Sequence, residues 1–443
     1  MSKTVAKYQR YAEYKDSGIV WMGNVPKHWT SERFKWSLTE KLKTSNPNLP
    51  AGSISFGEVI YKNEENLSSD TKASYQEVLK DEFLINPLNL NYDLKSLRTA
   101  LSKIDVVVST GYIVLHCNHL LDRNYVRWLL QEFDVAHMKT LGAGVRQTVN
   151  FSDIANCYFY LPEQLEQRKI AHFLDHETAK IDSLIEKQQQ LIQLLKEKRQ
   201  AVISHAVTKG LNSNVPMKDS GVEWLGQVPE HWIVSKLKYE SEVVDCRNKT
   251  PEYFENGEYF VIRTTNVKNQ KLNFNGALYT DKKNFEIWTQ RGVPPAGSIL
   301  FTREAPTGEV CLVPENIKFC MGQRMMNFIA NTKSYSDYLF DYLISDCLER
   351  YINSVSHGST VTHLRVEQVE NIPVLVPSDA EIKEIHHHIL IIKNKYDAIE
   401  NKAHQIIQLM QERRTALISA AVTGKIDVQN WQNPTEAKME FSA

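Results

Sequence analysis

The sequence lacks several features that would place it in common protein classes. It contains no run of about 18 uninterrupted apolar residues, and its start, MSKTVAKYQRYAEYKDSG, has no apolar segment of the kind that signal peptides need. We therefore expect a cytoplasmic protein without a membrane span. The six cysteines form no C-x-x-C pair, which makes zinc or redox sites unexpected and reduced thiols expected. The net charge of −1 excludes a wholly basic chain.

Motifs of the common catalytic sites are also missing. The sequence has no G-x-x-x-x-G-K-[ST] phosphate loop and no G-x-G-x-x-G after a strand, and Asn86-Pro87-Leu88 is its nearest approach to the N-P-P-[YF] of adenine methyltransferases. Glu13-Tyr14-Lys15 is an isolated E-x-K without the upstream acid that nucleases use. His386, His387 and His388 point about 100° apart on a helix and cannot converge on one metal ion. We expect a chain without catalytic activity or bound metal.

An internal repeat organises the 443 residues, a length that alone would suggest about three domains. The segment KDSGIVWMGNVPKHW at residues 15–29 returns as KDSGVEWLGQVPEHW at 218–232, with ten of fifteen positions identical. Residues 180–211 align with 395–426 without gaps, and fifteen of 32 positions are identical. The order is motif, variable segment and helix, followed by the same three parts again.

The second repeated piece predicts a long helix in each copy. Residues 167 to about 208 contain neither Gly nor Pro, and their apolar residues recur three and four positions apart. A helix of this size is roughly 60 Å long, and its partner spans about 380–423. Since an isolated helix would leave its apolar stripe in water, the pattern predicts that the two pack as an antiparallel coiled coil. Polar interruptions at Gln188, Lys198 and Arg413 leave the register open.

The segments between these pieces combine short β-rich runs with helical stretches. The predicted fold class is α+β: two globular α+β domains separated by two long helices, with an internal pseudo-twofold duplication. If the first motif folds back beside the end of the second helix, the twofold arrangement is complete. The predicted boundaries are 1–160 for the first motif and domain, 161–211 for the first helix, 212–376 for the second motif and domain, 377–428 for the second helix and 429–443 for a tail.

The repeated motif is followed by a domain-sized segment and then by a helix that begins P-x-x-x-E-Q-x-x-I-A-x-x-L-D at residues 162–175. This order resembles the specificity (S) subunit of type I restriction-modification systems, from about residue 14 to 428. The second helix lacks the Glu-Gln pair at its start. The resemblance implies two target-recognition domains that each read one half of a bipartite, asymmetric DNA site, and helices that set the spacer and dock methyltransferase subunits.

The resemblance also implies the partners: double-stranded DNA, two methyltransferase (M) subunits and two restriction (R) subunits, with no membrane. No cofactor is expected on this chain, because S-adenosylmethionine, ATP and Mg are used by the partner subunits. Two alternatives stay open. One is a coiled-coil adaptor whose flanking domains bind proteins, and the other is a stand-alone DNA enzyme.

Candidate DNA contacts come from small-residue turns that carry Arg, Gln and Thr, and from a mildly basic stretch after residue 233. Arg suits guanine and Gln suits adenine in the major groove, although such side chains can also contact phosphate or serve the fold. The candidates are Thr110, Arg146, Gln147 and Thr148 in the first domain, and Arg247, Lys249, Arg263, Thr302, Arg303, Gln323, Arg324, Thr360 and Thr362 in the second. The repeated Trp21, Trp29, Trp224 and Trp232 are predicted to be buried anchors.

Overall fold

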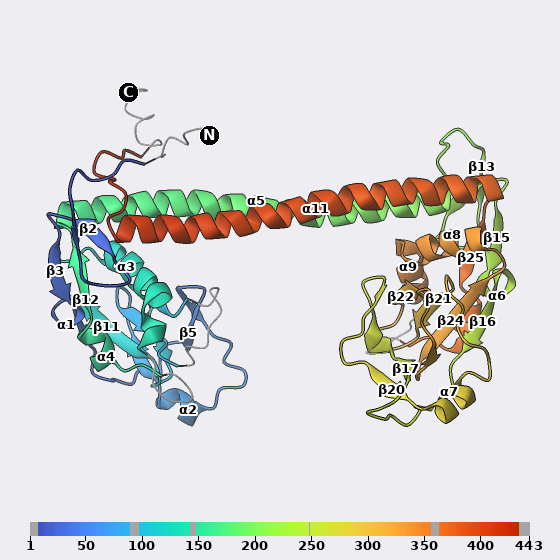
Figure 1. Ribbon diagram of the computed structural model, residues 1–443, viewed down its shortest axis with the longest axis horizontal. Helices are drawn as coiled ribbons and strands as arrows, with labels where there is room; N and C mark the ends of the chain where they lie inside the picture. The colour runs from blue at the N-terminus through green and yellow to red at the C-terminus, as the bar shows by residue number, and fades with distance from the viewer. Residues whose placement is uncertain (1–7, 89–96, 142–147, 248, 356–362, 434–443) are drawn as a thin grey trace. The chain divides into compact units, whose positions relative to one another are not determined.

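The computed structural model describes residues 8–88, 97–141, 148–247, 249–355 and 363–433 (Figure 1). The chain divides into two compact units. Unit 1 comprises residues 1–188 and 405–443, and unit 2 comprises residues 189–404. Both are mixtures of helix and strand, as the sequence predicts, and both long helices contribute residues to each unit.

Unit 1 is built around a four-stranded antiparallel sheet of order β4-β11-β8-β9. Its strands are β1 (Tyr14–Asp16), β2 (Asn24–Pro26), β3 (Thr30–Arg33), β4 (Leu38–Glu40), β5 (Gly52–Ser55), β6 (Glu58–Tyr61), β7 (Gln76–Val78), β8 (Phe83–Ile85), β9 (Thr99–Leu101), β10 (Val106–Val108), β11 (Ile113–Cys117) and β12 (Tyr158–Leu161). Its shorter helices are α1 (Phe34–Ser37), α2 (Ser69–Ala73), α3 (Arg123–Ala136), η1 (Met138–Thr140) and α4 (Phe151–Ala155).

Unit 2 is built around a four-stranded antiparallel sheet of order β16-β24-β21-β22. Its strands are β13 (Met217–Asp219), β14 (Gln227–Pro229), β15 (Ile233–Lys236), β16 (Ser241–Asp245), β17 (Tyr259–Ile262), β18 (Val267–Lys268), β19 (Lys271–Leu272), β20 (Leu278–Thr280), β21 (Ile299–Thr302), β22 (Val310–Leu312), β23 (Phe319–Met321), β24 (Met325–Ala330) and β25 (Pro373–Val376). Its shorter helices are α6 (Leu237–Glu240), η2 (Thr264–Asn266), α7 (Lys282–Trp288), α8 (Lys333–Leu343), α9 (Asp346–Val355) and α10 (Val366–Glu370).

The two sheets have the same topology, because each strand of one has a counterpart at the same place in the other. In both units one helix covers one face of the sheet, α3 in unit 1 and α8 in unit 2 (Figure 1). Each of these helices starts at a side-chain cap, Asp122 for α3 and Thr332 for α8, which accepts a hydrogen bond from a first-turn amide. Alternate strand residues face a second apolar cluster on the other side of the sheet.

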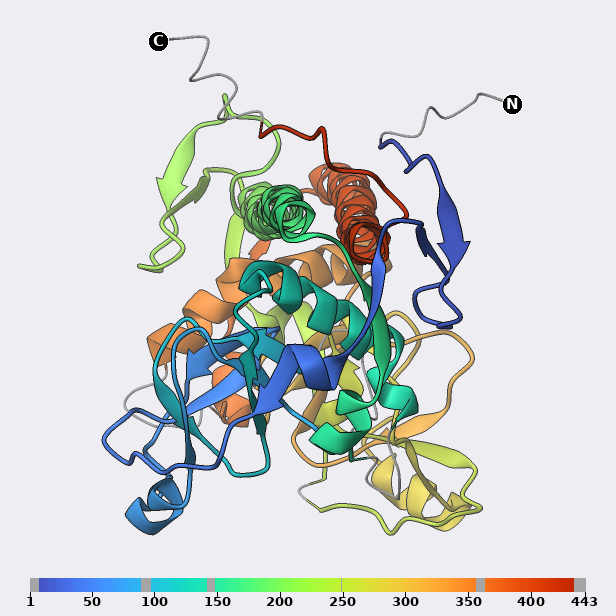
Figure 2. The same cartoon turned by 90° about the vertical axis from the view of Figure 1, so that its left-hand side faces the viewer.

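The long helices are α5 (Gln164–Lys209) and α11 (Asp379–Val422), close to the ranges that the sequence predicts. Figure 2 shows them side by side. In unit 1, Arg414 of α11 donates to Asp182 of α5 at 2.9 Å. In unit 2, Lys196 lies 3.3 Å from Glu400, and Arg199 lies 2.6 Å from Asp397. From the first pair to the second, the residue number increases on α5 and decreases on α11. The two helices are therefore antiparallel within unit 2.

The His-Trp dipeptide that ends each repeated motif holds the first turn of a long helix. In unit 1, His28 Nε2 lies 2.8 Å from Glu166 Oε2, and Trp29 Nε1 donates to Glu166 Oε1 at 3.0 Å. In unit 2, His231 and Trp232 contact Glu381 Oε1 at 2.9 and 3.1 Å. Glu381 thus occupies the place of Glu166. The second helix lacks the Glu-Gln pair as a pair, because Ile382 stands where the first helix has Gln167, but it keeps the glutamate.

The tryptophans of the motif are packing residues, as predicted. Trp29 and Trp232 are 1% and 0% exposed, Trp21 is buried and Trp224 is half-buried. Trp29 packs with the last turns of α11 in the core of unit 1. A Cβ on Gly424, the residue that ends this helix with a φ of +72°, would lie 2.3 Å from Pro26 Cδ. The N-terminal motif therefore folds back beside the end of the second long helix, as the order of the repeats predicts.

Candidate nucleic-acid interface

Three strands of the unit 2 sheet end or begin at one edge, here named the unit 2 edge. The strand β16 ends at Asp245 opposite Met326, and β21 ends at Thr302 opposite Met325, where β24 begins. Loops leave the sheet at this edge, and residues distant in sequence meet there. Such loop clusters on a rigid scaffold are common binding surfaces.

Arginines gather on the unit 2 edge around one carboxylate. Arg303 Nη2 lies 3.4 Å and Arg291 Nη1 3.9 Å from the carboxylate oxygens of Asp245. Arg324, whose side chain is 51% exposed, donates from Nε to Glu304 at 2.8 Å. Its φ of +66° belongs to the left-handed region, and its backbone carbonyl accepts a hydrogen bond from the Arg303 amide. The edge therefore presents three guanidinium groups: Arg291 and Arg303 share the Asp245 carboxylate, and Arg324 pairs with Glu304.

Three candidate cations near this edge have structural contacts. Arg247 donates from Nη1 to the carbonyl of Ile287 at 3.0 Å, and its guanidinium group lies over the ring of Trp288. Both contacts attach Arg247 to α7. The carbonyl of Lys249 accepts from the Trp288 indole, and the Lys249 side chain is exposed. Arg263 donates to the carbonyl of Gly276 at 2.8 Å. Arg247 and Arg263 are thus held in fixed positions, and Lys249 keeps its charge in solvent.

Thr302 belongs to the fold, because its side chain is 0% exposed. Its hydroxyl donates to the carbonyl of Pro306 at 2.6 Å and accepts from the Glu309 amide at 3.0 Å. These bonds close the loop after β21, so the hydroxyl does not reach the surface. Gln323, also a candidate, is exposed on the turn before β24.

Unit 1 has the equivalent edge, here named the unit 1 edge. The strand β8 ends at Ile85 opposite Ile113, where β11 begins. Lys43 Nζ donates to the carbonyl of Thr110 at 3.0 Å. The exposed Thr148 reaches the same edge, because the amide of the next residue, Val149, donates to the carbonyl of Pro87 at 3.2 Å. Thr110 and Thr148 are therefore brought together from distant parts of the sequence.

The same connection recurs in unit 2, where the Leu364 amide donates to the carbonyl of Arg303 at 3.1 Å. The candidates Arg146, Gln147, Thr360 and Thr362 lie outside the described residues. Lys43 and Arg291 were missed from the sequence. Arg291 lies in the turn that Gly292 closes on Thr289, and only its tertiary contacts with Asp245 and Cys246 place it at the unit 2 edge.

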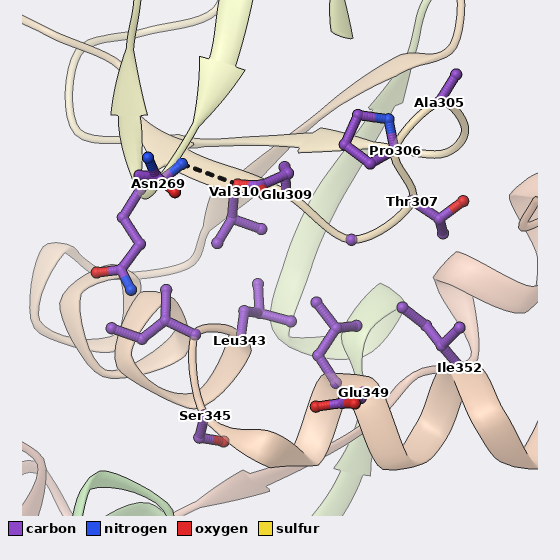
Figure 3. A pocket seen from close by; sticks show the side chains of 14 residues that line it. Asn269, Ala305, Pro306, Thr307, Glu309, Val310, Leu343, Ser345, Glu349 and Ile352 are labelled. Carbon is purple, nitrogen blue, oxygen red and sulfur yellow. Dashed lines mark hydrogen bonds between the residues drawn. The ribbon is translucent and has the colours of Figure 1, made fainter. Parts of the chain in front are cut away.

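A pocket of about 640 Å³ lies behind the loop that Thr302 closes (Figure 3). Its walls are the segment from Ala305 to Val310 and the helices α8 and α9. The amide of Asn269 donates to Glu309 Oε2 at 3.1 Å on one side. Aliphatic side chains and the carboxylates of Glu309 and Glu349 make this lining unfavourable for a phosphate group.

The part of the chain that the structure describes contains no group of three or more His, Cys, Asp or Glu side chains arranged to hold a metal ion. His386, the first of the three histidines, lies 2.6 Å from the buried carboxylate of Asp341. This hydrogen bond raises the pKa of His386. Over the same described ranges, no helix is long and apolar enough to cross a bilayer.

Two units of one sheet topology, each with an edge of converging loops and each sharing the same two long helices, define a duplicated recognition scaffold. The family described as Type I restriction modification DNA specificity domain matches residues 30–194 and 229–411. The chain belongs to this family.

Relatives and solved structures agree with this assignment. The chain is 25% identical over 302 residues to the type I restriction enzyme EcoKI specificity subunit of Escherichia coli K12, covering 64% of this chain and 61% of that protein. It is 26% identical over 191 residues to the MjaIX specificity subunit of Methanocaldococcus jannaschii, covering 41% of each. The chain thus matches about three fifths or less of the length of these relatives.

The fold resembles a chain from a structure concerned with complex assembly and conformational transition of the type I R-M system. Their TM-score is 0.67 at 13% identity, covering 91% of this chain and 99% of that one. The HsdS subunit from Thermoanaerobacter tengcongensis gives a TM-score of 0.50 at 13% identity, covering 91% and 98%.

Proposed function

We propose that this chain is the DNA sequence-recognition subunit of a type I restriction-modification complex. Each unit reads one half of a bipartite, asymmetric DNA site through its strand-end edge. The two long helices form an antiparallel coiled coil that sets the spacer and docks two methyltransferase subunits. Two restriction subunits complete the assembly, which acts in the cytoplasm.

One observation carries the proposal: the same edge of the same sheet bears different side chains in the two units. Lys43, Thr110 and Thr148 occupy the unit 1 edge, whereas arginines such as Arg303 and Arg324 occupy the unit 2 edge. Arg and Lys contact phosphates and guanine, while Thr can contact any base edge. Equivalent surfaces with different chemistry favour two unlike half-sites.

The chemistry of the proposed complex belongs to its partners. The methyltransferase subunits use S-adenosylmethionine to modify adenine, and the restriction subunits use ATP and Mg. This chain contributes positioning alone, through the arginines that Asp245 and Glu304 hold in place on the unit 2 edge and through the ordered turn at Thr110. It is therefore proposed to bind no cofactor and to catalyse no step.

A genome-wide methylation profile tests the proposal. The chain is co-expressed with its methyltransferase subunit, in a host without other adenine methylation. Modified adenines are expected in a split, non-palindromic motif that disappears when the chain is left out. The absence of modified adenines, or a continuous palindromic motif, would contradict the proposal.

Gel-shift measurements at two salt concentrations separate a DNA reader from a coiled-coil adaptor. Affinity for the motif-containing duplex should exceed that for a scrambled duplex, and both affinities should fall as salt rises because counterions are released on binding. Equal affinities for the two duplexes would favour the adaptor.

A further inference from the structure

Each long helix keeps one lengthwise stripe covered. On α5 the stripe consists of Ile181, Ile185, Gln188, Ile192, Leu195 and Arg199, all buried or half-buried. The equivalent residues of α11 are Tyr396, Glu400, Ala403, Ile407, Met410 and Arg414, which are also buried or half-buried. Alternating steps of four and three residues are typical of a helix that holds one face against a neighbour.

The residues that directly precede the stripe residues are here named the leading flank. They lie along one side of the stripe, because consecutive helical residues are about 100° apart. On α5 they are Lys180, Leu184, Lys187, Leu191, Leu194 and Lys198, and on α11 they are Lys395, Ile399, Lys402, Ile406, Leu409 and Arg413. All are exposed except the half-buried Ile406. Each helix thus presents cations and aliphatic side chains in the same order, without an acid.

The aliphatic residues of the leading flank are unusually open to solvent. Leu194 is 62% exposed and its counterpart Leu409 is 63% exposed. Leu184 and Ile399 form a second matched pair, at 40% and 37%. Equivalent positions therefore agree in side-chain type and in exposure, which is expected of a surface with one purpose in both copies.

The residues that directly follow the stripe residues, here named the trailing flank, behave differently. Four of its six positions change charge or side-chain type between the helices: Glu186 and Asn401, Gln189 and His404, Lys196 and Gln411, Gln200 and Thr415. Asp182, Lys196 and Asp397 of this flank form ion pairs between the two helices within their own units. Across the described ranges, no leading-flank cation forms an ion pair with the chain itself, so this flank is free for another molecule.

Each unit carries one complete copy of the leading-flank surface. Unit 1 holds Lys180, Leu184, Lys187, Ile406, Leu409 and Arg413, and unit 2 holds Lys395, Ile399, Lys402, Leu191, Leu194 and Lys198. The sheet edges of the two units differ, whereas these surfaces match. Their occupant must therefore be present twice and must be independent of the DNA sequence that each unit reads.

We propose that the leading-flank surface of each unit docks one methyltransferase subunit, through an aliphatic patch bordered by acidic side chains on that subunit. This inference rests on the proposed function and adds the docking face, its residues and its chemistry. Exposed leucines at the centre of the surface favour a protein partner over phosphate. A second copy of this chain is disfavoured, because matching surfaces would bring lysines together.

The test counts methyltransferase subunits bound to the full chain by native mass spectrometry and measures their affinity. The variant L184E/L409E changes only the unit 1 surface and should reduce two bound subunits to one. Combining it with L194E/I399E should leave none. The matched control S183E/Q405E adds the same charge to exposed positions on the outer side of the unit 1 helices, and it should keep both subunits bound.

Circular dichroism of each variant checks that the helices still form. If a glutamate variant unfolds, K180Q/K187Q/R413Q replaces it, and this variant should bind its unit 1 subunit at least tenfold more weakly and with less dependence on salt. Retention of both subunits at unchanged affinity in the folded variants would overturn the inference. So would a loss of DNA affinity with unchanged methyltransferase binding, which would assign the surface to DNA. If the proposed function itself were wrong, the unaltered chain would bind no methyltransferase or direct no methylation. That result differs from one in which only the variants behave unexpectedly.

Discussion

At the residue scale, Glu381 shows how the repeated motif stabilises a helix start. Burial by itself raises the pKa of this carboxyl group, but hydrogen bonds from Ser378, Trp232 and His231 outweigh that effect and lower it from 4.5 to about 2. A depressed pKa stabilises the folded state above the unfolded value and loses this contribution as the pH falls through the folded value. The contribution of Glu381 is therefore present above pH 4.5 and disappears between pH 4.5 and about 2.

Substituting E381Q tests this contribution. At pH 7 the variant should have a free energy of unfolding about 1–2 kcal/mol lower, since it loses hydrogen bonds to a charged group. It should also lose less stability than the unaltered chain between pH 4.5 and 2. Denaturant titrations at several pH values measure both effects. Parallel pH profiles for the two proteins would show that Glu381 does not carry this dependence.

Gly424 should be intolerant of any side chain. The variant G424A adopts an unfavourable left-handed conformation, at a cost of about 1–2 kcal/mol. Its Cβ also meets Pro26 Cδ at 2.3 Å, which adds about 1–3 kcal/mol of crowding. G221A is the matched control, because Gly221 has the same φ of +72° and nothing within 4 Å of its Cβ. Thermal unfolding should show the larger loss for G424A, and equal losses would refute the close packing.

Arg324 is an accessible guanidinium group on the unit 2 edge, with 51% of its side chain exposed. R324A should weaken binding to the specific duplex by about 1–3 kcal/mol and relax the sequence preference of one half-site, as expected for loss of an arginine contact to a base. T302V removes a buried hydroxyl in the same loop and should mainly lower the thermal stability of unit 2. Fluorescence anisotropy with specific and scrambled duplexes measures the first effect. An unchanged specificity ratio for R324A would place this residue outside base recognition.

At the element scale, the three ion pairs between α5 and α11 share one register. Inserting seven residues after Gln190 and seven after Gln405 keeps the stripe of each helix in phase and lengthens the pair by roughly 10 Å. Under the proposed function, the spacer of the DNA site should grow by about three base pairs, given a rise of about 3.4 Å for each. The methylation profile of the variant reads out the spacer. An unchanged target would count against the helices as the ruler.

Insertion into one helix alone is the control for this experiment. The added residues then have no partners on the other helix, and the interhelical ion pairs of one unit cannot form. We expect loss of methylation, with no new spacer.

At the scale of the whole molecule, the duplication predicts that the two half-sites are separable. Replacing residues 30–160 with the corresponding segment of another family member should change one half of the target and leave the other half intact. The repeated motif before the segment and the helix after it provide the same packing surfaces for any such insert. Comparison of methylation motifs before and after the exchange measures this, and a change in both halves would contradict it.

Much of the architecture could be predicted from the sequence, because it depends on local patterns. The repeated motif reveals the duplication, and the spacing of apolar residues in a stretch without Gly or Pro predicts the two long helices. The burial of Trp29 and Trp232 also follows from their place in the motif. These features depend on residues close together along the chain, or on direct comparison of two segments.

The candidate interface depended on the tertiary structure. Thr110 and Thr148 were proposed from the sequence, but only the pairing of β8 with β11 and the contact of Val149 with Pro87 bring them to one edge. Strand order likewise gathers Arg291 and Arg303 around Asp245, and it turns the hydroxyl of Thr302 inward. Contacts between residues so far apart depend on which strands pair and in which register. The sequence by itself therefore determined the repeat and the two long helices. Only the tertiary structure decided which stripe of each helix is covered, since the apolar Leu184, Leu191 and Ile399 are exposed, and strand pairing decided which side chains face a partner.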